Sequence, residues 1–219
     1  MNIKTLLKIA IIAALVALPA AAGATTPSDI YTIGMTKGAQ FVYWDIDANT
    51  GKKTTTTVNM GPAVFEEEEY LFYFDNSNPY KLWVEDEDFY GEGYYFYFDS
   101  WDSTLLRQAE NLYSGSCVVY MYLLTDAHGN PIKSSDNWYT YMENNPGRYK
   151  YFYIEGALHM NAVFSPKNQT VVVQTSGFVP MEAELDNYSS YSGTYTETSW
   201  SYGDCSLNIP PFTMYYMYY

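Results

Sequence analysis

The chain has 219 residues, among them 25 tyrosines, 11 phenylalanines and 5 tryptophans, and its formal net charge is −14 at pH 7. So acidic a surface argues against nucleic acid and anionic membranes as partners, because both are negatively charged. With only two histidines, the chain also has little material for a histidine-rich metal centre or a Ser-His-Asp triad.

The first 24 residues have the organisation of a secretory signal peptide. Lys4 and Lys8 form a positive region, residues 9–18 are apolar, and residues 22–24 are small enough for cleavage. The apolar stretch is shorter than the roughly 20 residues that span a bilayer, so we expect export without stable membrane insertion after cleavage. The mature chain, residues 25–219, is then expected to be a single β-rich domain outside the cell or on its surface. Its net charge would be −16, because cleavage removes two lysines from a chain of charge −14.

An acidic turn separates two predicted strands at residues 41–44 and 54–58. Asp45 and Asp47 invite comparison with a calcium-binding loop, but threonine stands at the sixth and twelfth positions, where an EF-hand has glycine and glutamate. A β-hairpin that turns at residues 49–51 accounts better for this segment.

An aromatic phrase occurs twice, as Tyr-Leu-Phe-Tyr-Phe-Asp at residues 70–75 and as Tyr-Tyr-Phe-Tyr-Phe-Asp at residues 94–99. Side chains alternate across a strand, so each copy presents large apolar or aromatic groups to both faces of a sheet. Such a strand has to be covered on both sides, or covered on one side and stacked against another molecule on the other. The residues expected to take part in self-assembly are Tyr70, Phe72, Phe74, Tyr94, Phe96 and Phe98.

A third strand is predicted between the two copies, at residues 80–84. The economical arrangement is an antiparallel meander with one copy on either side of this strand. A short helix is predicted next, at residues 102–115, where Asp102 or Ser103 can cap the start and Gly115 can close the end.

Two acidic runs, residues 66–69 and 85–88, lie close to the first aromatic copy. The simplest interpretation is that both runs are exposed to solvent, where their charge discourages the neighbouring aromatic strand from pairing with a wrong partner. The alternative is a patch in which Ca²⁺ or another divalent cation screens the acidic clusters. The weak candidate ligands for that cation are Glu66, Glu68, Asp86 and Asp88.

Short strands separated by polar turns continue through the second half of the chain. They are predicted at residues 117–124, 149–154, 157–164 and 170–173. The spacing predicts an all-β fold with one short helix, either an antiparallel β-sandwich or a stacked β-arch domain with Tyr/Phe-rich strands.

Cys117 and Cys205 are the only cysteines. In an exported protein they are expected to form a disulfide, within the chain or between subunits. An intramolecular bond across 205 − 117 = 88 positions would stabilise the fold by about 4–5 kcal/mol in the chain-entropy model.

No catalytic or cofactor-binding motif occurs, so the chain is not expected to be an enzyme or to hold a cofactor. The one catalytic device that the composition permits is a pair of carboxylates of the glycosidase type. Glu155 is the best candidate, with Glu182 or Glu184 as its partner. Glu155 is more simply an ordinary carboxylate at the end of a strand.

The leading hypothesis is an exported structural subunit that binds copies of itself. Tyrosine suits repeated subunit contacts, because it combines a large apolar area with a hydroxyl that tolerates a wet interface. The tyrosine-rich phrases, such as residues 94–98 and 214–219, resemble in composition and architecture the sheath proteins of filamentous methanogenic archaea. The resemblance implies a β-rich, amyloid-like subunit that assembles into rings and tubes around the cell, without enzyme activity. It also implies cross-links between neighbours through Cys117 or Cys205.

The alternative is a secreted β-sandwich that binds carbohydrate or acts as an adhesin, since exposed aromatic rings can stack on sugars. A monomer with a few exposed tryptophans is expected in that case. The candidate platform residues are Trp83, Trp101, Trp138 and Trp200. Asn168 and Asn187 fit the N-glycosylation pattern, which matters only in a host that glycosylates exported proteins.

Overall fold

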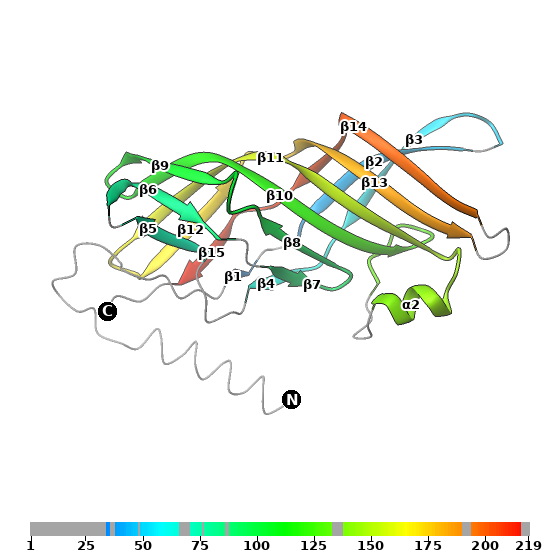
Figure 1. The fold of residues 1–219 in the computed structure, drawn as a ribbon, viewed down its shortest axis with the longest axis horizontal. Coiled ribbons are helices and arrows are strands. Elements are labelled where there is room, and N and C mark those ends of the chain that lie inside the picture. The colour runs from blue at the N-terminus through cyan, green and yellow to red at the C-terminus, as the bar shows by residue number, and fades with distance from the viewer. Residues whose placement is uncertain are drawn as a thin grey trace, which may run out of the picture.

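Antiparallel strands dominate the computed structural model (Figure 1), and α2, Trp138–Asn144, is the one helix in the part of the chain that is described. The predicted all-β class with one short helix and Tyr/Phe-rich strands is therefore confirmed. None of the described residues belongs to a helix long and apolar enough to cross a membrane. The structure describes residues 34–35, 38–47, 49–65, 71–75, 77–85, 88–132, 138–189 and 194–215.

The strands join into one sheet with the order β3-β2-β14-β13-β11-β12-β15-β1-β4-β7-β8-β10-β9-β6-β5, and β10 also pairs with β11. Their bounds are β1 (Gly34–Met35), β2 (Gln40–Ile46), β3 (Lys53–Asn59), β4 (Ala63–Phe65), β5 (Phe72–Asp75), β6 (Asn78–Val84), β7 (Phe89–Gly91), β8 (Tyr94–Phe98), β9 (Thr104–Ala109), β10 (Leu112–Asp126), β11 (Tyr149–Ser165), β12 (Thr170–Thr175), β13 (Val179–Ser189), β14 (Thr194–Asn208) and β15 (Phe212–Tyr215).

The long pairing of β10 with β11 organises this sheet. All 15 residues of β10 pair with β11, from Leu112↔Val163 to Asp126↔Tyr149. The other edge of β11 is shared by β13 and β12, and the other edge of β10 is shared by β8 and β9. From β8 the pairings lead through β7, β4, β1, β15 and β12 back to β11, so the sheet curls over its own apolar face (Figure 1).

Strand alternation decides which side chains form the core. Along β10 the odd-numbered residues Cys117, Val119, Met121 and Leu123 are buried, whereas most even-numbered residues are half-buried. The inward residues of the other strands join the same cluster, so the described residues share one continuous core. Its aromatic centre stacks Phe89 on a β8 phenylalanine with ring centroids 4.7 Å apart.

The hairpin predicted at residues 49–51 is confirmed, since β2 pairs with β3 up to Ile46↔Lys53. The Asp47 side chain accepts hydrogen bonds from the backbone N–H groups of Thr50, at 2.7 Å, and Asn49, at 2.9 Å. These bonds lower the pKa of Asp47, with the Thr50 N–H contributing most. The carboxylate thus stabilises the turn.

The predicted meander is confirmed only in its first half. The first aromatic copy, β5, pairs with β6 as expected, for example Tyr73 with Trp83. The other edge of β6 is occupied by β9 instead of the second copy. That copy, β8, lies between β7 and β10. Local spacing therefore predicts the hairpin but not the long-range neighbours.

The helix predicted at residues 102–115 is wrong. These residues include β9 and the start of β10, which are joined by a tight turn. Leu105 is fully buried whereas Leu106 is 53% exposed, which is the alternation of a strand. Because β9 pairs with strands on both sides, tertiary hydrogen bonding overrides the weak local preference for a helix. The strands predicted at 149–154 and 157–164 are also one continuous strand, β11.

Gly115 of β10 lies close to the backbone of Thr104, the first residue of β9. A β-carbon at this position would overlap the backbone carbonyl oxygen of Thr104. This oxygen belongs to the backbone of a paired strand, so it cannot rotate away as a flexible side chain would. Gly61 offers a matched contrast, because a β-carbon there would meet nothing within 4 Å.

We predict that Gly115→Ala destabilises the fold by about 1–3 kcal/mol or more, because the new methyl group overpacks a backbone contact. Chemical denaturation monitored by circular dichroism measures the change. Gly61→Ala is the control and should leave the free energy of unfolding within about 1 kcal/mol of the parent value. Equal stabilities of the two variants would contradict the close approach.

Candidate functional site

The outward side of β7, β8, β10 and β11 carries a continuous layer of tyrosines. Along β8, alternation buries Tyr94, Phe96 and Phe98 and turns Tyr95 and Tyr97 outward. The pairing register then sets the outward tyrosines of neighbouring strands beside them. We call this layer the tyrosine face, and its members are Tyr90, Tyr95, Tyr97, Tyr120, Tyr122, Tyr151 and Tyr153.

Rings of the tyrosine face contact one another across the strands. Tyr95 stacks on Tyr122 with centroids 4.7 Å apart, and Tyr122 lies 5.2 Å from Tyr153. Tyr97 lies 5.3 Å from Tyr120. Each such pair contributes about 0.5–1.5 kcal/mol beyond the area it buries. The contacts hold the rings as a rigid, half-buried layer.

Helix α2 docks against the tyrosine face through its first residue. The Trp138 ring lies 5.6 Å from that of Tyr95 and 5.9 Å from that of Tyr151. Tyr139, the next residue of the helix, is 74% exposed. Trp138 therefore extends the aromatic surface at the end of the sheet where α2 lies (Figure 1).

Burial raises the pKa values of four tyrosines of this face, which are Tyr95, Tyr97, Tyr120 and Tyr153. Desolvation, followed by the neighbouring Tyr122 and Tyr120 hydroxyls, raises the pKa of Tyr97 to about 12. The pKa values of Tyr95 and Tyr153 are raised further, again mainly by burial. The Tyr153 hydroxyl also donates a hydrogen bond to Glu155 Oε2 at 2.7 Å. At neutral pH the face is thus uncharged and able to form hydrogen bonds.

Carboxylates lie next to the tyrosine face on the side of β13. Glu155 is directly opposite Glu182, and Tyr153 is opposite Glu184. A shallow cavity of about 240 Å³ lies over them and is also lined by residues of β14, among them Ser199. The register thus brings together the carboxylates that the sequence offers as a catalytic pair.

The carboxylate pair lacks the surroundings that glycoside hydrolysis requires. One carboxyl of such a pair has to be kept protonated by an apolar environment. Glu182 and Glu184 are exposed and Glu155 is only half-buried. Within the described residues, no group of three or more His, Cys, Asp or Glu side chains is arranged to hold a metal ion.

A serine and a histidine also meet on the outward side of the β10–β11 ladder. Ser114 Oγ lies 2.8 Å from His159 Nε2. None of the carboxylates in the described part of the chain hydrogen-bonds this imidazole, so the third member of a hydrolytic triad is missing. The pair is best explained as a cross-strand hydrogen bond.

The predicted self-assembly residues divide between the core and a sheet edge. Tyr94, Phe96 and Phe98 are at most 1% exposed, so their side chains have no surface to offer a second molecule. Phe72 is fully buried and Phe74 packs against the core, although their strand β5 ends the sheet order. Tyr70 lies outside the described residues. In the second copy of the aromatic phrase, the residues that belong to the tyrosine face are the two between the buried ones, Tyr95 and Tyr97.

The predicted disulfide is absent, and both cysteines are buried free thiols. Cys117 Sγ on β10 lies 3.9 Å from Met160 Sδ, and Cys205 Sγ on β14 lies 3.2 Å from the carbonyl oxygen of Met181. Burial raises the pKa of both thiols to about 12. In this fold they are too buried and too weakly acidic to cross-link neighbouring subunits.

The calcium candidates are mostly outside the described residues, which include Asp88 but not Glu66, Glu68 or Asp86. Asp88 accepts a hydrogen bond of 2.6 Å from the Tyr90 hydroxyl, at the margin of the tyrosine face. Residues 1–24, predicted to be a signal peptide, likewise lie outside the described part of the chain.

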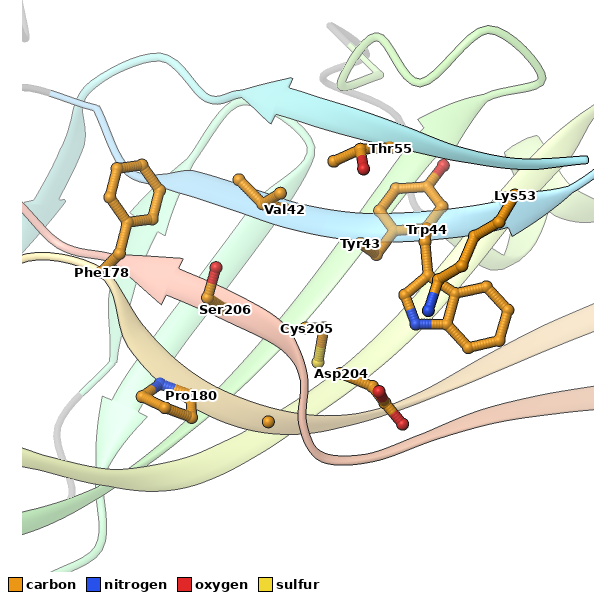
Figure 2. A pocket seen from close by; sticks show the side chains of 11 residues that line it. Val42, Tyr43, Trp44, Lys53, Thr55, Phe178, Pro180, Asp204, Cys205 and Ser206 are labelled. Carbon is orange, nitrogen blue, oxygen red and sulfur yellow. The ribbon is translucent and has the colours of Figure 1, made fainter.

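The four candidate tryptophans do not form one platform. Trp200 is 2% exposed and packs in the core, whereas Trp101 is 90% exposed in the turn after β8. Trp83 stacks on Tyr73, with centroids 6.2 Å apart, under the ammonium group of Lys81. Of these four tryptophans, Trp138 alone contacts the tyrosine face. Trp44, which is not one of these four candidates, lines a pocket of about 340 Å³ (Figure 2).

No protein-family model matches the chain, and comparison with curated proteins finds no similar sequence.

We predict that the tyrosines titrate in two classes. An ordinary tyrosine ionises near pH 10, whereas burial raises the pKa of Tyr97 to about 12 and raises the pKa values of Tyr95 and Tyr153 further. The unfolded chain loses these protons near pH 10, so stability is complete below that pH and falls as the pH rises from 10 toward 12. Absorbance at 295 nm and denaturation midpoints measure both effects.

The variant Tyr97→Phe is the control for this titration. It removes one late-titrating hydroxyl and should make the loss of stability above pH 10 smaller. A single titration near pH 10 in the native protein would contradict the burial of these hydroxyls.

We predict that neither cysteine reacts with Ellman's reagent at pH 8 in the native protein, because both thiols are buried and their pKa values are about 12. Denaturation without reductant should release two thiols per chain. Finding none in denaturant would show that a disulfide had formed and would contradict this arrangement of the core.

Proposed function

We propose that the chain is an exported structural subunit that binds copies of itself and builds an extracellular sheath or another polymer of the cell surface. The observation that carries the proposal is the tyrosine face. It is a preformed aromatic layer on the outward side of the central strands, and each of its rings is at least partly exposed to solvent.

The chemistry of this layer suits a protein–protein contact. Tyrosine and tryptophan are enriched at the centres of interfaces, because they bury much area and have few rotatable bonds to immobilise. Mutual stacking already fixes Tyr95 and Tyr122, so ordering them on binding costs little conformational entropy. Their neutral hydroxyls can pair with a partner or with trapped water.

Open strand edges supply a second means of contact. In the described sheet, β3 stands at one end of the strand order and β5 at the other. Each has one neighbour, so the backbone groups on its outer edge are available to a strand from another molecule. β3 is rich in exposed threonines and seven residues long, which makes it the longer of the two edges.

Acidic groups border the tyrosine face and determine the conditions for assembly. Asp88 lies near Tyr95, and Asp99 and Glu155 lie near Tyr120. Copies that bring these borders together repel one another, as the net charge of −14 also indicates. Salt at about 0.15 M reduces the range of the repulsion to about 8 Å, so the aromatic centre can make contact.

Electron microscopy and X-ray fibre diffraction of the mature protein at this ionic strength test the proposal. Tubes, rings or sheets with a ~4.7–4.8 Å reflection would support a β-stacked polymer. A dispersed monomer at high concentration would contradict it and would favour a secreted carbohydrate-binding or adhesin domain.

We predict that Tyr97→Thr combined with Tyr120→Thr weakens self-association at least tenfold, because about 1.4 kcal/mol of lost contact suffices. Threonine preserves the β-propensity of both strands. Sedimentation velocity measures the association, and circular dichroism verifies the fold.

The matched control is Tyr80→Thr. Tyr80 is 65% exposed on β6, outside the tyrosine face. It should associate like the parent protein. If the double variant also associates like the parent, the tyrosine face is not the contact.

A further inference from the structure

A pocket opens where β2 and β14 separate. Their pairing extends only over residues 40–42 and 206–208. Beyond it the register of β14 on β13 shifts, because Met181 is opposite Cys205 whereas Ala183 is opposite Trp200. Residues 201–204 form the resulting bulge. Between this bulge and the β2–β3 hairpin lies a cavity of about 340 Å³ (Figure 2).

Aromatic groups stand at both ends of this pocket. Figure 2 shows Phe178 at one end and Trp44 with Lys53 at the other, and Val42 and Ser206 lie between them. The Phe178 side chain is 53% exposed. Lys53 Nζ lies 3.9 Å from the centroid of the Trp44 ring. The pocket thus combines a solvent-exposed ring with an anchored tryptophan.

The indole N–H of Trp44 is buried and has no hydrogen-bond partner. Buried donors in native proteins nearly always have one, and the neighbouring Trp200 Nε1 donates to the backbone oxygen of Trp44 at 2.9 Å. In Figure 2 the nitrogen-bearing edge of the Trp44 ring is turned toward the middle of the pocket, beside Lys53 Nζ. An oxygen that enters between them would satisfy the donor.

The lysine side chain can give way to such an oxygen. Lys53 is exposed and flexible, and its contact with the indole ring is of the solvent-exposed cation–π type. That contact is weaker than the free energy lost when a buried donor stays unpaired. A ligand that takes the indole N–H therefore gains more than the displaced ammonium loses, and it can accept a hydrogen bond from the ammonium as well.

The charged side chains that line the pocket favour a neutral ligand over a charged one. Lys53 supplies a cation and Asp204 an anion, so a charged ligand of either sign meets a like charge. A hydroxyl group donates and accepts at once and can pair with both side chains, and with the hydroxyls of Thr55 and Ser206. The exposed Phe178 ring can pack against the C–H face of a ring compound.

We propose that this pocket binds a neutral, hydroxylated ring, that is, one sugar residue of a glycan. Its volume of about 340 Å³ lies at the small end of the roughly 300–1,000 Å³ that ligand pockets have, which suits a single ring. The pocket shares no residue with the tyrosine face, so this inference does not depend on self-association.

The test titrates the mature protein with neutral sugars and follows the tryptophan indole N–H signals by NMR. The probes are glucose, galactose, mannose, N-acetylglucosamine and their disaccharides. We expect at least one of them to shift a single indole signal, and that signal to be missing in Trp44→Phe. Trp101→Phe is the matched control, because Trp101 is 90% exposed and does not line the pocket.

Substitution of exposed residues that line the pocket changes the sugar affinity without disturbing the hydrophobic core. Asp204→Ala and Lys53→Ala should each lower the affinity about tenfold, because each removes a hydrogen bond to the bound hydroxyls. Lys52→Ala, on the same hairpin but outside the pocket, should leave the affinity unchanged. The proposal fails if no sugar shifts an indole signal, or if the three alanine variants bind alike. Tighter binding of glucuronate or glucosamine than of glucose would overturn the neutral ligand class.

Discussion

The unbroken ladder between β10 and β11 is the constraint on which the rest of the structure depends. It fixes the register of the two central strands over 15 residue pairs, and hence the direction of every side chain on them. Strands that join either side inherit the same division into an inward and an outward face. On β8 that division turns Phe96 into the core and Tyr97 to the surface, although the two residues differ by one hydroxyl.

The hydroxyl explains this division. A buried hydroxyl without a partner costs free energy, so phenylalanine is the cheaper residue inside and tyrosine the better one at a wet surface. The tyrosines that do face inward have partners. The hydroxyl of Tyr94 donates to the Gly61 oxygen at 2.6 Å, and that of Tyr113 donates to the Pro79 oxygen at 3.3 Å. Tyr43 Oη accepts a hydrogen bond from Lys150 Nζ at 2.9 Å.

Features that depend on residues close together in the sequence could be predicted, whereas features that depend on pairing between distant segments could not. The alternation of apolar and polar residues predicts most of the strands, and the turn residues at 49–51 predict the hairpin of β2 and β3. The neighbours of β8 depend on pairing with segments far along the chain, which no local pattern encodes. The segment around Leu105 and Leu106 has a periodicity that suits a helix, but the open edges of β6 and β10 recruit it as a strand.

The candidate sites show the same limit. The carboxylates of β11 and β13 can be named from the sequence, yet only the register shows that Glu155 faces Glu182 and that neither is sheltered. An even number of cysteines in an exported protein predicts a disulfide, but the number alone does not show whether Cys117 and Cys205 lie close together in the fold. The pocket at Trp44 arises from a bulge in β14, and a bulge changes the register without leaving a periodic signal.

The negative charge of this chain repels other copies, whereas its aromatic rings favour contact. The two kinds of group are separated on the surface. The tyrosines occupy the centre of the outward face, whereas Asp88, Asp99 and Glu155 stand at its border. Protein interfaces also have an apolar centre and a polar, solvated rim, so this arrangement supports the proposed self-association. Ions can screen the rim because water reaches it, but they cannot weaken the contact of neutral rings at the centre. In the proposed assembly, the acidic chain therefore stays dispersed at low salt and associates through its tyrosines once its charges are screened.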